Sequence, residues 1–424
     1  MEKRMSRLFF QYLILVVWLV ISIDDGFCYP IDGFPLSGIR RLERLRLIVE
    51  GKMQGPKPLS GAQRSITSIN LNLIDARQRD PVDFFKPGTT MQRDIEALFP
   101  DRHESYSLAL LDITAGVDKT RFAQIQGDRQ FSPGSVGKLA VAAGLFHELK
   151  DIYPDEPEKR RNLLVQRMVI AGKWIHRDHH DVPIFNPADG SFVSRPIREG
   201  DSFSLYEWAD HMLSASANAA ASTVWKEAIL MRKFGRKYPP TPEEEKNFFE
   251  KTPKSELTET AMSIVNDPLR ESGITQQEWQ LGSLFTSEGK RMVPSGGSSR
   301  GTPKGLLKFL IGMEQGKIVD EWSSLEIKRL MYMTARRIRY ASSPALNGAA
   351  VYYKSGSLYR CKPEPDFKCL KYRGNVENVM NSVAIVEHTD GRTYLVALMS
   401  NVLRKNSAVE HQTLATYIDR ILKK

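Results

Sequence analysis

A serine and a lysine three residues apart, at the start of an apolar helical run, most constrain how this chain folds. They are Ser135 and Lys138 in the segment Phe131-Ser-Pro-Gly-Ser-Val-Gly-Lys. Apolar residues follow at helical spacing, namely Leu139, Val141, Ala142, Leu145, Phe146 and Leu149. On the first turn of a helix, side chains three residues apart share one face, about 5–6 Å apart at Cβ. The pattern therefore predicts a buried helix whose start brings the Lys138 amine to the Ser135 hydroxyl.

This pair has the chemistry of a nucleophile and its base. If burial or a nearby cation lowers the pKa of Lys138, the amine accepts the proton of Ser135 and the hydroxyl attacks a carbonyl. The positive end of the helix then stabilises the anion that forms there. Ser-x-x-Lys alone is a weak signal, because a second match runs from Ser287 to Lys290 in a Gly- and Ser-rich segment. The hypothesis therefore depends on further motifs.

Two further motifs follow in order along the chain. Ser216-Ala-Asn218 lies between two predicted helices, and Lys354-Ser-Gly356 closes a predicted strand. Class A β-lactamases and penicillin-binding proteins carry Ser-x-x-Lys, Ser-Asp-Asn and Lys-Thr-Gly in this order. The chain thus resembles the penicillin-recognising serine hydrolases, and most closely their class A β-lactamase-like branch.

The resemblance runs from about residue 105 to the C-terminus and implies a fold. Gly200-Asp-Ser-Phe-Ser-Leu205 resembles the family's lead-in to the second motif, and Thr302-Pro303 resembles a family helix start. The implied fold is an α+β sandwich of β-lactamase/transpeptidase type, with helices flanking an antiparallel sheet and an inserted all-helical lobe. Periodicity predicts strands over 106–113, 120–126, 349–353, 382–387 and 393–400, and helices over 90–98, 139–149, 162–173, 205–213, 219–231, 325–337 and 414–422.

The resemblance implies catalytic roles for Ser135, Lys138 and Ser216. Ser135 is the nucleophile, Lys138 accepts or relays its proton, and Ser216 bridges Lys138 and the leaving nitrogen and passes a proton on. The backbone N–H groups of Ser135 and Ser357 form the oxyanion hole, which stabilises the transition state for acylation. Together these groups predict a covalent acyl-enzyme.

Five residues are predicted to bind the substrate. Asn218 hydrogen-bonds a substrate amide, and Lys354 supplies positive charge for a substrate carboxylate. The hydroxyls of Ser355 and Ser357 bind the same carboxylate, and Gly356 lets the strand approach the ligand closely.

A fourth catalytic residue, Glu278, is predicted from a weaker match. The class A branch activates the deacylating water with the Glu of a Glu-x-x-Leu-Asn loop, and Glu278-Trp-Gln-Leu-Gly282 is the nearest match. Gly282 replaces the Asn that helps to hold the water, and Ala217 replaces the Asp of the second motif. Glu278 is therefore either the deacylating base or a solvated surface acid. The two replacements put efficient turnover of β-lactams in question more than they do acylation.

Three functions remain open from the sequence. The first is a serine β-lactamase that opens β-lactam amides by hydrolysis through an acyl-enzyme on Ser135. The second is a cell-wall D-Ala-D-Ala peptidase or amidase with slow deacylation. The third is a non-catalytic exported relative that keeps the fold.

No cofactor and no metal are expected. His176, Asp178, His179, His180 and Asp181 have the residue types of a zinc site. Adjacent residues rarely converge on one ion, however, so this segment is interpreted as a polar loop.

The N-terminus predicts export. Residues 1–28 combine a basic start with a short apolar run, as in a signal peptide or an N-terminal membrane anchor. We therefore expect a periplasmic or extracellular protein, with inner-membrane anchoring through this run as the alternative to cleavage. The net charge of +10 is interpreted as favouring solubility, and no nucleic-acid motif is present. The expected partner is a small β-lactam or cell-wall peptide, and the expected state is a monomer.

Three segments complete the sequence-based division of the chain. Residues 29–90 form an extension of unknown role, with strands predicted near 42–49 and 66–73, and residues 91–424 form the hydrolase domain. Residues 232–257, rich in Lys, Glu and Pro, are predicted to be a solvated insertion. Cys361 and Cys369 lie close together in an exported protein, which predicts a disulfide.

Overall fold

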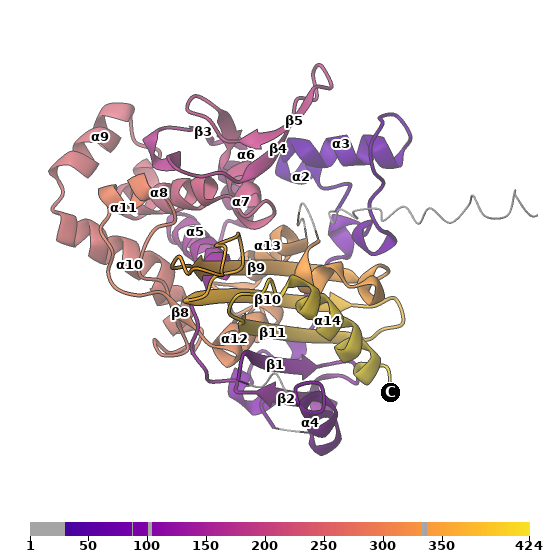
Figure 1. The fold of residues 1–424 in the computed structure, drawn as a ribbon. Helices are drawn as coiled ribbons and strands as arrows, with labels where there is room; N and C mark the ends of the chain where they lie inside the picture. The colour runs from indigo at the N-terminus through magenta and orange to yellow at the C-terminus, as the bar shows by residue number, and fades with distance from the viewer. Residues whose placement is uncertain (1–29, 87, 101–103, 333, 335–336) are drawn as a thin grey trace, which may run out of the picture.

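The computed structural model describes residues 30–424 except 87, 101–103, 333, 335 and 336 (Figure 1). The predicted signal peptide or anchor lies outside the described residues. Within the described part, no helix combines the length and apolarity that a membrane span requires.

One five-stranded antiparallel sheet, built from both ends of the hydrolase domain, forms the centre of the fold. Its order is β2 (Arg121–Ile125), β1 (Tyr106–Asp112), β11 (Thr393–Asn401), β10 (Glu377–Glu387) and β9 (Ala350–Arg360). The turn at Asp390-Gly391 joins β10 to β11, and Gly391 adopts a positive φ of 91° there. Since β1 pairs with β11 along its whole length, the N-terminal hairpin completes a sheet that the C-terminal strands begin.

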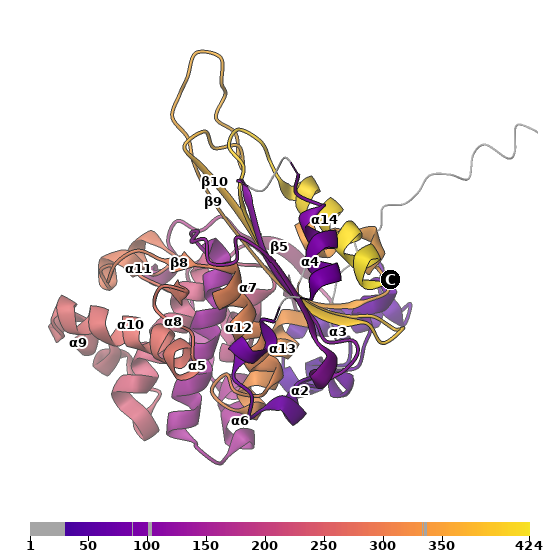
Figure 2. The same cartoon turned by 90° about the horizontal axis from the view of Figure 1, so that it is seen from below.

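Both faces of the sheet are buried, and helices cover each of them (Figure 2). Alternate residues of β11 enter two separate cores: Leu395 faces one and Val396 the other. Helices α4 (Thr89–Glu96) and α14 (Ala408–Leu422) cover one face, and α12 (Pro303–Glu314) and α13 (Glu321–Tyr332) lie on the other. This two-sided burial explains why β11 is a continuous apolar run from Tyr394 to Met399. The predicted α+β sandwich is confirmed.

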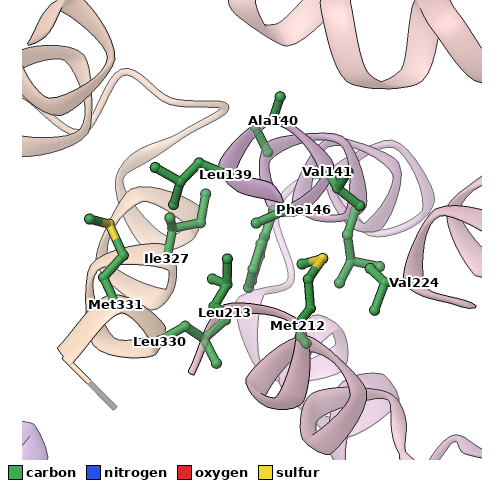
Figure 3. Packing of buried hydrophobic residues seen from close by; sticks show 14 of the residues in the cluster. Leu139, Ala140, Val141, Phe146, Met212, Leu213, Val224, Ile327, Leu330 and Met331 are labelled. Carbon is green, nitrogen blue, oxygen red and sulfur yellow. The ribbon is translucent and has the colours of Figure 1, made fainter. Parts of the chain in front are cut away.

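The inserted lobe, predicted to be all-helical, is mostly helical but also holds short two-stranded sheets. It surrounds α5 (Lys138–Ile152), which is buried along nearly its whole length. Helices α7 (Leu205–Leu213), α8 (Asn218–Phe234) and α10 (Lys254–Glu271) pack against it. Figure 3 shows the packing, in which Phe146 of α5 lies between Met212 of α7 and Ile327 of α13. A helix that is buried along nearly its whole length therefore fixes the position of the Ser135–Lys138 pair at its N-terminal end.

The remaining elements are shorter or peripheral. They are α2 (Phe34–Ser37), α3 (Arg40–Val49), α6 (Pro157–Gln166), β3 (Met168–Ile170), β4 (Asp181–Phe185), β5 (Phe192–Pro196), β6 (Ser202–Ser204), α9 (Pro242–Lys251), β7 (Trp279–Gln280), α11 (Ser287–Met292) and β8 (Arg300–Gly301).

The strands predicted in the N-terminal extension are wrong. Residues 40–49 form helix α3, and residues 66–68 form a 3₁₀ turn. The buried residues of α3 are Arg41, Leu42, Leu45 and Ile48. The three apolar ones lie three residues apart, which is the spacing of a helix and not the alternation of a strand.

Two other predictions need correction. The helix predicted over 162–173 begins earlier, with Pro157 in its first turn, and ends at Gln166, because Met168–Ile170 pairs with β6. The predicted insertion 232–257 is largely helical. Thr241 caps α9 with a capping box, and Phe249 is buried against the ring of Trp174.

Candidate active site

The Ser135 hydroxyl lies against the Lys138 amine, as the sequence predicts. Ser135 occupies a 3₁₀ turn, Gly134–Gly137, that leads directly into α5 at Lys138. The Lys138 Nζ atom lies 2.9 Å from Ser135 Oγ. The contact has the length of a hydrogen bond, so a proton can pass between these atoms.

The other contacts of Lys138 fit a neutral amine. Its Nζ lies 2.6 Å from the Ser216 carbonyl oxygen and 2.7 Å from Asn218 Oδ1. Both oxygens only accept hydrogen bonds, so they take the two hydrogens of a neutral amine. The lone pair is then left for the Ser135 hydroxyl, which is the arrangement that a general base requires.

Burial favours this neutral form. The Lys138 side chain is fully buried, and burial lowers its pKa to about 7 against the opposing charge of Asp178. At neutral pH a large fraction of the amine is therefore unprotonated. The predicted Ser135–Lys138 chemistry is supported by both geometry and charge.

Ser216 connects two lysines. Its carbonyl accepts from Lys138, and its Oγ accepts from Lys354 Nζ at 2.8 Å. The residue adopts a φ of 61°, an uncommon conformation for a non-glycine residue that aims both groups into the site. Its hydroxyl thus contacts Lys354, whereas the sequence-based interpretation placed it between Lys138 and the leaving group.

The surroundings of Lys354 disfavour its charged form. Its side chain is 2% exposed, and burial, followed by the charges of Lys138 and Arg339, lowers its pKa well below the usual value. An incoming substrate carboxylate would raise this pKa again, so the charge of Lys354 depends on the ligand.

Strand β9 approaches the Ser135 turn too closely for any side chain at Gly356. A Cβ atom there would lie 2.3 Å from the Pro133 carbonyl oxygen and 3.0 Å from the Ser135 nitrogen. Asn381 on β10 holds the same turn by donating to the carbonyls of Ser132 and Pro133. The backbones of Ser135 and Ser357 are thereby brought together, as an oxyanion hole requires.

These groups open into a cavity of about 740 Å³, here called the Ser135 cavity. Its lining includes the predicted residues Ser135, Asn218 and Ser357. The loop after β9 contributes Lys371 and Tyr372, and this loop carries the predicted disulfide between Cys361 and Cys369. The disulfide-bearing loop therefore forms part of the rim of the cavity.

Glu278 does not line the Ser135 cavity. The pairing of Trp279 with Gly301 holds Glu278 beside α12, where its carboxylate bonds Lys308 Nζ at 2.7 Å. The same carboxylate accepts from the backbone N–H of Thr275. The predicted role as deacylating base does not fit this position.

In the segment that follows Glu278, Phe285 is the residue whose ring faces the Lys138 amine. Its ring centroid lies 4.9 Å from Lys138 Nζ, and it lines the Ser135 cavity. Gly282 packs so tightly that a Cβ would lie 2.1 Å from the Gly297 carbonyl oxygen. The absence of Asn at position 282 thus has a packing reason, and the loop presents an aromatic ring to the amine.

Sequence reasoning missed Arg339. This residue has a φ of 54° and donates from Nη1 to the Gly356 carbonyl at 2.7 Å and from Nη2 to Ser357 Oγ at 3.1 Å. It adds a guanidinium beside the hydroxyl that was predicted to bind a carboxylate. Several arginines surround it in the sequence, so no motif distinguished it.

Asp178 was predicted as part of a polar loop and lies in the Ser135 cavity with His180. One Asp178 oxygen accepts from the backbone N–H of Ala219 at 2.8 Å, and the other lies 2.6 Å from His180 Nδ1. Burial raises the pKa of Asp178, but the contacts with His180 and Ala219 outweigh it and leave the pKa below its usual value. Asp178 therefore stabilises the first turn of α8 and places a negative charge near Lys138.

Comparison with known proteins gives a family match to part of the chain and a shared fold. Residues 257–421 match the Beta-lactamase enzyme family. No curated protein matches the chain. A class A β-lactamase from Bacteroides cellulosilyticus is similar in structure, with 15% identity, a TM-score of 0.50, and coverage of 81% of this chain and 97% of that chain.

Two further solved structures are similar at comparable identity. The TLA-3 extended-spectrum β-lactamase has 12% identity, a TM-score of 0.51, and coverage of 79% of this chain and 99% of that chain. PBP-A has 16% identity, a TM-score of 0.49, and coverage of 80% and 96%. The family match to residues 257–421, the shared fold and the three motifs agree with the predicted resemblance to the penicillin-recognising serine hydrolases.

Proposed function

We propose that this protein is a penicillin-binding serine acyltransferase of the cell-wall peptidase type, which forms an acyl-enzyme on Ser135 and hydrolyses it slowly. The observation that carries the proposal is the environment of Lys138. This amine is buried and bonded to Ser135, and it faces the ring of Phe285, while the predicted base Glu278 bonds Lys308 instead. Lys138 can therefore serve as the base for acylation, whereas Glu278, the predicted base for hydrolytic deacylation, lies elsewhere.

The acylation step follows from the contacts. Ser135 Oγ attacks the amide or β-lactam carbonyl carbon while its proton passes to Lys138. The C–N bond breaks, and the Ser216 hydroxyl protonates the leaving nitrogen and regains a proton from Lys354. The carboxylate of the substrate is bound by Lys354, Ser355, Ser357 and Arg339.

Slow hydrolysis is expected from the residues around the acyl ester on Ser135. A water that attacks the acyl-enzyme needs a base, which contributes about 10²–10⁴ in rate in such reactions. Glu278 is held by Lys308, outside the Ser135 cavity. We therefore expect one β-lactam to be bound per molecule and to be released slowly.

A hydrolytic β-lactamase is the second candidate, and one observation favours it. His180 lines the Ser135 cavity and is oriented by Asp178. A histidine oriented by a carboxylate can act as a general base toward a water. Fast turnover that is lost in His180→Gln would favour this candidate.

Rapid mixing with nitrocefin tests the proposal. The expected result is a burst of about one equivalent of opened β-lactam, followed by a slow steady phase. Glu278→Gln should leave both phases unchanged. Steady turnover without a burst, abolished in Glu278→Gln, would contradict the proposal.

The disulfide favours a compartment outside the cytoplasm. Cys361 and Cys369 are joined in a loop at the rim of the site, and structural disulfides persist mainly in oxidising compartments. Export and the monomeric state remain predictions.

A further inference from the structure

A second cavity lies away from Ser135, beside helix α9 of the predicted solvated insertion. Its volume is about 740 Å³, and it is called the α9 cavity below. Its lining comes mainly from α8, α9, α11, strand β3 and the turn at 172–174. Figure 1 shows α9 at the outer edge of the helical lobe. Among the described residues, the α9 cavity and the Ser135 cavity share no lining residue, so the two are separate sites.

One face of α9 forms a wall of this cavity. The residues of α9 that line it recur at helical spacing, and they are Pro242, Glu245, Lys246, Phe249 and Glu250. Two contacts hold this face in place. The Phe249 ring lies 5.1 Å from the Trp174 ring, measured between centroids, and Glu245 bonds the Nζ atom of the buried Lys226 at 2.7 Å. The wall is therefore formed before any ligand binds, as is usual for small-molecule sites.

The interior and the opposite wall of the α9 cavity are apolar. Trp174 and Phe249 are buried in its floor. Met168 and Ile170 lie on one face of β3, at 48% and 67% exposure. Exposed apolar side chains beside a cavity mark a place where an apolar ligand gains burial. The volume also lies in the range of about 300–1,000 Å³ that is typical of small-molecule sites.

The lining of the α9 cavity has an excess of positive charge. Three ion pairs neutralise part of it, and they are Arg167–Glu227, Lys226–Glu245 and Arg291–Glu288. The remaining charged residues of the described lining are Lys173, Lys246, Lys254 and Glu250. All four are exposed, so they lie at the rim and not in the floor. A rim with more basic than acidic groups attracts an anion.

We propose that the α9 cavity is a binding site for a small molecule that joins an apolar body to an anionic group. The apolar body lies between the rings of Trp174 and Phe249 and the exposed side chains of β3, where it loses contact with water. The anionic group stays at the rim, where Lys173 and Lys246 lie. This inference is independent of the proposed function, because it requires no chemistry at Ser135.

A matched pair of dyes tests the ligand class. Anilinonaphthalene sulfonate joins an apolar body to one sulfonate, and phenylnaphthylamine has the same body without the charge. Fluorescence titration should show saturable binding of one sulfonate dye per molecule, with an affinity about tenfold higher than that of the neutral dye. Equal affinities for the two dyes, or no saturable binding of the sulfonate, would overturn the inference.

A variant of the apolar wall tests the location. Ile170→Glu places a carboxylate beside the apolar body and should raise the dissociation constant of the sulfonate dye about tenfold or more. Val409→Glu on α14 is the matched control, because Val409 is 66% exposed and does not line the cavity. Both positions are exposed, so both variants should fold. The same dye affinity in the two variants would overturn the inference.

A variant of the rim tests the charge. Lys246→Glu should also weaken binding of the sulfonate dye about tenfold, whereas binding of the neutral dye should stay the same. Lys251→Glu is the control, because Lys251 ends the same helix, is exposed and lies outside the described lining. Equal weakening of sulfonate binding in the two variants would show a general effect of net charge and would contradict a site at this rim.

The Ser135 cavity also has basic residues in its lining, including Lys371, so dye binding there must be distinguished. Lys371→Glu should leave the affinity for the sulfonate dye unchanged. Ser135→Ala should do the same even if no acyl-enzyme forms on the unaltered protein, so failure of the proposed function leaves this test intact. Loss of dye binding in Lys371→Glu, with binding retained in Ile170→Glu and Lys246→Glu, would place the dye in the Ser135 cavity and overturn the inference.

Discussion

The ring of Phe285 lies over the amine of Lys138, with Nζ 4.9 Å from the ring centroid. This amine is buried, and burial lowers its pKa to about 7, which favours the neutral base that acylation needs. The segment after Glu278 thus presents a ring to Lys138, while the carboxylate of Glu278 bonds Lys308.

A carboxylate at position 285 should therefore accelerate deacylation. We predict that Phe285→Glu releases a penicillin adduct at least about tenfold faster, within the range of a positioned general base. Phe285→Gln is the matched control, because Gln has the shape of Glu without its charge. The measurement is the decay of the adduct after excess penicillin has been removed. Equal decay rates in the two variants would contradict the prediction, because a carboxylate at position 285 would then not accelerate hydrolysis of the adduct.

The acylation rate should depend on pH through Lys138. Its pKa is lowered to about 7, and the neutral amine is the active form, so the rate should rise as pH increases through about 7. Asp178 raises the pKa of Lys138, so Asp178→Asn should move the profile to lower pH. Asn keeps an oxygen that can accept from Ala219 and so preserves the start of α8. The measurement is the pH profile of the acylation rate by stopped-flow mixing. The same profile in Asp178→Asn would show that Asp178 does not influence the pKa of Lys138.

Arg339 should determine recognition of the substrate carboxylate. Its guanidinium bonds the Ser357 hydroxyl and the Gly356 carbonyl. We predict that Arg339→Met lowers the acylation efficiency for benzylpenicillin about tenfold to hundredfold, as expected for a lost charge-assisted hydrogen bond. The methyl ester of the same penicillin is the control, because it lacks the charge. An equal loss for acid and ester would indicate damage to the backbone and not lost recognition.

The N-terminal extension should contribute to stability through one buried ion pair. Arg41 and Asp210 are 3% and 0% exposed. Arg41→Ala leaves the Asp210 charge unpaired and should lower the free energy of unfolding by about 3–5 kcal/mol. Arg41→Met combined with Asp210→Leu should recover most of this loss. Denaturant titration of the three proteins checks the prediction, and a single variant as stable as the double variant would contradict it.

The parts of the fold that could be predicted from the sequence are those whose signal is local. The apolar run after Ser135 specifies α5, and Thr302 followed by Pro303 specifies the start of α12. Ser135, Lys138, Ser216 and Asn218 come together because each lies at the start of a helix or between two helices. A short motif is sufficient to indicate such positions.

The rest could not be predicted because it depends on contacts between distant segments. Glu278 matches a motif locally, but the pairing of β7 with β8 directs it to Lys308. Arg339 acquires its role from the approach of β9, and α3 was ambiguous because its apolar residues fit two periods. The pairing of Asp178 with the start of α8 spans 41 residues of sequence and has no local signature.

Intact mass spectrometry after brief exposure to benzylpenicillin tests the central claim most directly. We predict that the protein gains the mass of one penicillin, that the adduct persists after the excess is removed, and that Ser135→Ala gains none. An adduct of equal yield on Ser135→Ala, or an unmodified protein beside intact penicillin, would contradict an acyl-enzyme on Ser135. An unmodified protein beside fully opened penicillin would contradict slow hydrolysis.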